Sequence, residues 1–148
     1  MSTVETSVWI NAPLSKVYEI AKDNRSFPEF MKDVQSINVI EEGPEGRVVS
    51  DWVGLISAFN IKVRWQQEDV WDDAARTCKF RQLKGDYDQM EGIWTFVEEN
   101  GGVRLTTNLE YEYNVPTLGP LVKKVVHHLV VQNLESMNAA FKSRAESK

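Results

Sequence analysis

Hydrophobic and polar residues alternate along most of residues 3–113. Residues 3–10 follow this two-residue period, which predicts a half-buried β-strand. The same period predicts six further strands, at residues 34–41, 46–55, 59–71, 77–84, 89–98 and 103–113. Short breaks rich in Gly, Pro, Asn and Asp separate most of them. Because a parallel crossover needs about a dozen residues, these short connections predict an antiparallel meander.

A helical period replaces the alternation in two regions. Apolar residues recur at helical spacing over residues 14–22, and a second short helix is expected at residues 27–31. Near the C-terminus, helical spacing predicts a long helix from Thr117 or Leu118 to about Arg144. Such a helix is about 40 Å long and would cross the whole sheet. It is therefore expected to cover the dry face of the sheet.

The dry face of the strands combines large aromatic side chains with several polar ones. An unpaired buried polar group costs about 1–3 kcal/mol, so a fully closed core tolerates few of them. We therefore expect a hollow between sheet and helix, with a closed aromatic core as the alternative. The expected lining residues are Val63, Trp65, Gln67, Phe80, Gln82, Met90, Trp94, Thr107, Leu109, Tyr111, Val125 and Leu129.

Composition and charge narrow the class of protein. The chain has 148 residues, of which 42% are hydrophobic and 26% charged, as in one soluble globular domain spanning 1–148. Its net charge of -5 argues against DNA and anionic membrane surfaces as partners. The N-terminus lacks the features of a secretory signal, and charged residues interrupt the apolar stretch at 118–134. A cytoplasmic protein without an integral membrane segment is expected, and no oligomeric state is predicted.

Few residues offer catalytic or metal chemistry. His127 and His128 are the two histidines, and adjacent helix positions point about 100° apart, so neither a metal nor a cofactor is expected. Cys78 has no evident partner base and is interpreted as a small buried hydrophobe. Asp69 or Glu91 would become a candidate general base if it faced the cavity, although the alternation places Glu91 outside. No catalytic residue is assigned.

Several motifs resemble the START-like superfamily of polyketide cyclases, aromatases and coenzyme Q-binding proteins. They lie at residues 10–18, 27–30, 63–65 and 85–96, and their order and spacing cover nearly the whole chain. The resemblance implies a helix-grip fold of the α+β class. In this fold, a curved antiparallel sheet of about seven strands and two short helices surrounds a long C-terminal helix. A cavity between sheet and helix is implied as well.

Activity varies within this superfamily, which includes enzymes, lipid carriers and sensors. In aromatase/cyclases, an arginine on the strand of Trp65 and a tyrosine after the Pro-Glu helix are implicated in handling the polyketide. This sequence has Asp69 and Val34 at those positions. The favoured hypothesis is therefore binding or transport of a hydrophobic small molecule, such as a lipid, polyketide or quinone-like compound. The alternatives are a polyketide cyclase/dehydratase-type enzyme and a protein or ribosome interaction module that uses an exposed apolar segment at 27–31.

Overall fold

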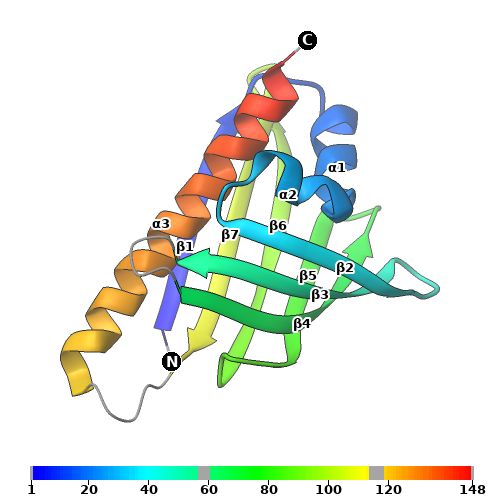
Figure 1. Ribbon diagram of the computed structural model, residues 1–148. Helices are drawn as coiled ribbons and strands as arrows, with labels where there is room; N and C mark the ends of the chain where they lie inside the picture. The colour runs from blue at the N-terminus through cyan, green and yellow to red at the C-terminus, as the bar shows by residue number, and fades with distance from the viewer. Residues whose placement is uncertain (1, 57–60, 114–118, 148) are drawn as a thin grey trace.

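The computed structural model describes residues 2–56, 61–113 and 119–147. Its frame is a seven-stranded sheet in the order β1-β7-β6-β5-β4-β3-β2 (Figure 1). All neighbouring strands are antiparallel, so the expected meander is confirmed. The strands are β1 (Ser2–Ile10), β2 (Val34–Glu42), β3 (Arg47–Ile56), β4 (Ile61–Asp72), β5 (Thr77–Gly85), β6 (Gln89–Glu99) and β7 (Gly102–Glu112).

One long helix lies along the inner face of this sheet, beside β1 (Figure 1). The helical elements are α1 (Leu14–Lys22), the 3-10 turn η1 (Asn24–Ser26), α2 (Phe27–Phe30) and α3 (Gly119–Glu146). Figure 1 shows α1 and α2 near the C-terminal half of α3. This is the expected helix-grip arrangement. The expected helix start at Thr117 or Leu118 and strand start at residue 59 lie outside the described residues.

The sheet bends strongly, so that β2, β3 and β4 cross the direction of β1, β6 and β7 in Figure 1. The ladder register shifts twice in β2, and again between Gln66 and Gln67 of β4. Such bulges increase the local twist of a strand. Gly85 approaches β4 closely, because a Cβ there would lie 2.5 Å from the Trp65 Cα, and its φ is +152°. Only glycine therefore fits where β5 turns against β4.

Four aromatic side chains close the space between the sheet and the C-terminal half of α3. Phe27 is fully buried at the centre of this aromatic cluster. Its ring meets Phe141 edge-on at 5.3 Å and Trp52 at 5.9 Å, and Trp94 meets Phe141 at 5.6 Å. Edge-to-face contacts of this kind add to the free energy of area burial. At this end of the sheet the interior is a closed aromatic core.

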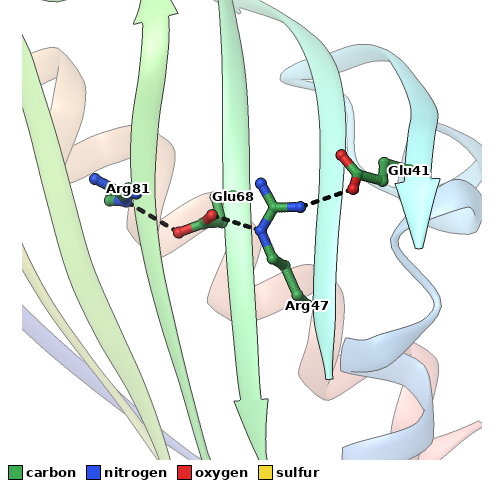
Figure 2. A network of polar contacts seen from close by, with 4 residues as sticks. All are labelled: Glu41, Arg47, Glu68 and Arg81. Atoms are coloured by element: carbon green, nitrogen blue, oxygen red, sulfur yellow. Dashed lines mark hydrogen bonds and ion pairs between the residues drawn. The ribbon is translucent and has the colours of Figure 1, made fainter. Parts of the chain in front are cut away.

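A ladder of ion pairs crosses the outer face of the sheet (Figure 2). Glu68 of β4 lies at its centre and bonds Arg47 Nε at 2.7 Å and Arg81 Nε at 2.9 Å. Arg47 continues the ladder to Glu41 of β2, with Nη1 and Oε1 3.0 Å apart. The Glu68 side chain is only 12% exposed. The hydrogen bonds from both arginines lower the pKa of Glu68. The ladder joins β2 to β5 without using the inner face.

Replacing the central carboxylate tests this ladder. Glu68→Gln is expected to lower the free energy of unfolding at neutral pH by about 1 kcal/mol, in the range of partly exposed ion pairs. Because the folded-state pKa of Glu68 is lowered, its stabilisation is present above the unfolded value of about 4.5 and is lost as pH falls through the folded pKa. Urea titrations of both proteins at neutral and acidic pH measure the difference.

The matched control is Glu5→Gln, an exposed position on the outer face of β1. It is expected to change stability by less than about 0.5 kcal/mol. Equal effects of the two substitutions would show that the ladder contributes nothing specific.

Candidate functional site

A cavity of ≈ 110 Å³ lies between the inner face of the sheet and the middle of α3. The aromatic cluster forms one end of it, because Trp52 and Trp94 belong to both. Most of its wall is apolar. The lining residues are Asp33, Val34, Trp52, Gly54, Leu55, Val63, Trp65, Gln67, Phe80, Tyr87, Met90, Trp94, Leu109, Val130, Asn133, Leu134 and Met137.

The structure brings together seven of the twelve lining residues expected from the sequence. Each comes from an inward position of β4, β5, β6 or β7, where the alternation of apolar and polar residues is regular. They are Val63, Trp65, Gln67, Phe80, Met90, Trp94 and Leu109. Their assignment as ligand-binding residues stays a prediction.

Two polar residues that were expected to line the cavity make contacts elsewhere in the structure. Gln82 clamps the turn between β5 and β6: its Nε2 donates to the Tyr87 carbonyl at 2.8 Å, and its Oε1 accepts from the Tyr87 amide at 3.2 Å. Thr107 is buried in the sheet between Thr6 and Trp94. Asn138 of α3 donates to Thr6 Oγ1 at 3.1 Å, so the helix covers the sheet at this level. Neither Gln82 nor Thr107 lines the cavity.

Three other expected lining residues also lie off the cavity. The Tyr111 hydroxyl lies 3.0 Å from His127 Nδ1, and the two rings are stacked, so Tyr111 joins β7 to α3. Val125 is 43% exposed, because the apolar stripe of α3 that faces the sheet runs through residues 126, 130, 134 and 137. Leu129 is buried but does not line the cavity.

Sequence patterns carry little signal for the lining residues of β2, β3 and the β5–β6 turn. The inward positions of β3 are Ser50, Trp52 and Gly54, whose small and polar members break the apolar pattern. A Cβ at Gly54 would lie 3.1 Å from Trp65 Cζ3, so a larger residue there would require the Trp65 ring to shift. Tyr87 lies in a turn motif and reaches the cavity because its ring meets the Trp65 ring at 5.8 Å. These assignments required three-dimensional contacts.

A chain of hydrogen bonds runs along the inner face of β4, from the cavity wall into the closed interior. Trp65 Nε1 donates to Gln67 Oε1 at 2.9 Å, and Gln67 Nε2 donates to Asp69 Oδ1 at 2.7 Å. We call these three residues the polar chain. Alternate residues of a strand face the same side, which is why the three side chains meet. Trp65 and Gln67 line the cavity, whereas Asp69 lies behind Gln67.

Asp69 is a carboxyl group in a nearly dry environment, with 6% of its surface exposed. Desolvation raises its pKa from 3.8 to about 6, while the hydrogen bond from Gln67 opposes the rise and the charge of Glu68 adds to it. Burial, followed by the charge of Asp69, also raises the pKa of the Cys78 thiol. Cys78 is therefore a buried thiol rather than a nucleophile.

Other expected features of the chain can now be placed. Glu91 is exposed on the outer face, as the alternation indicated. Phe27 and Met31 are buried, so the segment 27–31 does not offer the exposed apolar contact expected for an interaction module. Within the part of the chain that the structure describes, no group of three or more His, Cys, Asp or Glu side chains is placed to hold a metal ion. No described helix is long and apolar enough to cross a membrane.

Neutralising the buried carboxyl has a predictable effect on stability. The folded pKa of Asp69 lies above its unfolded value, so the folded state binds more protons and stability falls as pH rises from 3.8 to about 6. This pKa difference corresponds to about 3 kcal/mol. Asp69→Asn is therefore expected to remove this loss and to be more stable than the wild type at neutral pH. Denaturant titrations from about pH 4 to about pH 7.5 measure it.

Asp51→Asn, on the exposed face of β3, is the matched control and is expected to leave the pH profile of the wild type unchanged. A profile for Asp69→Asn that follows the wild type would contradict a raised pKa at Asp69.

Known proteins of similar sequence or structure align with almost the whole chain. The ribosome association toxin RatA of Pseudomonas aeruginosa PAO1 is 24% identical over 148 residues, covering 99% of this chain and 97% of that protein. The crystal structure of TTHA0849 from Thermus thermophilus is 36% identical, with a TM-score of 0.90 and 97% of each chain covered.

A second solved structure shares the fold at lower identity. The ZhuI aromatase/cyclase from Streptomyces sp. R1128 is 20% identical, with a TM-score of 0.84 over 98% of this chain and 93% of that one. The family model described as polyketide cyclase / dehydrase and lipid transport matches residues 10–138. This match spans most of the chain, from the end of β1 well into α3. The chain therefore belongs to the polyketide cyclase / dehydrase and lipid transport family.

Proposed function

We propose that the protein binds and carries a hydrophobic small molecule, such as a lipid, polyketide or quinone-like compound, between the sheet and α3. The observation that carries this proposal is the cavity of ≈ 110 Å³ beside Trp65 and Trp94. An interior built only for stability would fill that space, because voids in a core cost free energy. The description of the family includes lipid transport, which supports the same conclusion.

The cavity wall suits a flat apolar ligand. Trp52 and Trp65 stack at 5.5 Å with 20° between their planes, and Phe80 meets Trp94 at 5.9 Å. Aromatic walls hold a ligand by dispersion and by removing apolar surface from water. A cavity of about 150 Å³ accommodates one benzene ring. The cavity of ≈ 110 Å³ is smaller than this, so a single-ring ligand requires its wall to shift outward slightly, and a two-ring ligand such as naphthalene requires α3 to move away from the sheet.

A second candidate is a cyclase or dehydratase acting on a polyketide-like substrate. Two observations support it. Asp33, which carries a carboxyl group, is one of the residues that line the cavity, and the chain is similar to an aromatase/cyclase. A general acid or base has to reach the reacting proton. Asp33→Asn separates the two functions, because it would abolish turnover of a polyketide-like substrate while ligand binding persists.

Filling the cavity tests the carrier proposal directly. Val130→Phe adds bulk to the lining of the cavity from α3. Isothermal titration of the wild type with naphthalene is expected to show binding, and Val130→Phe is expected to weaken it at least about tenfold because the added ring occupies the site. Native mass spectrometry of gently purified wild type is expected to show a bound apolar compound that the variant lacks.

The matched control is Val125→Phe, the same substitution on the exposed side of the same helix. It is expected to keep the wild-type affinity within about twofold. Circular dichroism confirms that both variants fold. If the wild type binds neither naphthalene nor a co-purified compound, the carrier proposal is wrong.

A further inference from the structure

We infer that the cavity selects neutral ligands that carry a hydroxyl group, with Gln67 as the accepting group and Asp69 as the residue that positions it. This inference rests on the proposed function and specifies its ligand class. It is built on three features: the locked orientation of the Gln67 amide, the buried carboxylate behind it, and the charges around the cavity.

The orientation of the Gln67 amide is fixed from both sides. The indole Nε1 of Trp65 can only donate a hydrogen bond, so the atom 2.9 Å from it has to be the amide oxygen. An ionised Asp69 can only accept, so the atom 2.7 Å from its Oδ1 has to be the amide nitrogen. Rotating the amide by 180° would break both bonds. The cavity therefore meets a side chain with one defined orientation.

Asp69 strengthens Gln67 as an acceptor. A hydrogen bond from an amide N–H to a carboxylate is charge-assisted and polarises the amide, which increases the negative charge on its oxygen. Gln67 Oε1 retains one lone pair after accepting from Trp65. A ligand hydroxyl that enters the cavity can donate to this lone pair. Protonation of Asp69 removes the charge assistance and allows its carboxyl to donate a hydrogen bond. This weakens both the acceptor strength of Gln67 Oε1 and the fixed orientation of the Gln67 amide.

Charges around the cavity disfavour an anionic ligand. Asp33 is the one charged residue among the described residues of the lining, and Asp69 lies directly behind Gln67. Arg64 is exposed, and Arg81 is bound to Glu68 on the outer face of the sheet. A carboxylate or phosphate in the cavity would lose its hydration without gaining a cation. A neutral hydroxyl loses much less hydration, and its hydrogen bond to Gln67 Oε1 offsets that loss.

The titratable groups around Asp69 are few. Glu68 precedes it on β4 and points to the outer face, and Cys78 lies on the neighbouring strand β5. From the helices, Lys22 and Tyr18 of α1 act on Cys78. None of these groups is hydrogen-bonded to Asp69 in the described residues, where its bond is to Gln67. Asp33 on the lining can also titrate, so a change of ligand preference in mildly acidic solution reports on Asp69 only where Asp69→Asn abolishes it.

Three ligands that share an ethylphenyl group and differ in the para substituent test the selectivity. Ethylbenzene, 4-ethylphenol and 4-ethylbenzoate are titrated into the wild type by calorimetry at about pH 7.5. We expect 4-ethylphenol to bind about fivefold more tightly than ethylbenzene, because this is the net gain in affinity from one neutral hydrogen bond. We expect 4-ethylbenzoate to bind at least about tenfold more weakly than 4-ethylphenol, because its charge is buried unpaired. Equal affinities for ethylbenzene and 4-ethylphenol, or tight binding of 4-ethylbenzoate, overturn the inference.

Variants assign the selectivity to the polar chain. Gln67→Met is expected to abolish the preference for 4-ethylphenol over ethylbenzene, while Gln66→Met, on the adjacent outward position of β4, keeps it. Lowering the pH to about 5 is expected to reduce the preference about threefold in the wild type and to leave it unchanged in Asp69→Asn. If Gln67→Met does not fold, the pH comparison decides, since Asp69→Asn keeps the shape of the side chain. A wild-type preference independent of pH refutes the positioning role of Asp69.

Failure of this inference is distinguishable from failure of the proposed function. If naphthalene binds while the three ligands show no discrimination, the cavity carries apolar molecules and the hydroxyl selectivity is wrong. If naphthalene and all three ligands fail to bind, the hydroxyl selectivity is wrong, and if no apolar compound co-purifies either, the carrier proposal is wrong as well.

Discussion

A single long helix has to cover the inner face of a seven-stranded sheet, and the interior of the protein depends on how it does so. The strands bend around α3, so the helix meets the sheet closely along only part of its length (Figure 1). Near its C-terminal end, Phe141 joins Phe27 and Trp94 in a closed aromatic cluster. Nearer its middle, Val130 and Met137 face the cavity instead. The closed core and the hollow are therefore two parts of one packing arrangement.

Polar groups inside this interior are paired with one another, which is what the low dielectric constant of a protein core demands. Ser50 accepts from the Trp52 indole at 2.9 Å, and the polar chain satisfies Trp65 and Gln67. Asp69 differs from these neutral groups because it can carry a charge. It is desolvated, and its hydrogen bond comes from an amide rather than from a cation. Natural proteins retain such costly groups chiefly at sites of function. The position of Asp69 behind the cavity wall fits that rule.

Membership of the family does not choose between a carrier and an enzyme, because one fold supports both. The choice depends on the side chains of the cavity. Its wall is largely aromatic and aliphatic, and the outer face of the sheet holds the ion-pair ladder of Glu41, Arg47, Glu68 and Arg81 (Figure 2). The ladder thus lies on the outer face, whereas Asp33 is the one charged residue among the described residues of the cavity lining. A largely apolar wall of this kind supports the carrier proposal.

Periodicity along the chain is enough to locate the strands, the helices and the inward residues of β4 to β7, because a period of two or of 3.6 residues records which side of each element is dry. Trp65, Gln67 and Trp94 could be placed in this way. The same pattern does not specify the exact phase of α3, where apolar residues such as Val125 and Val130 occur on more than one side. Packing against the sheet selects which of them are buried. Contacts between elements also make Gln82 clamp a turn and bring Tyr87 to the cavity, and such contacts leave no periodic trace in the sequence.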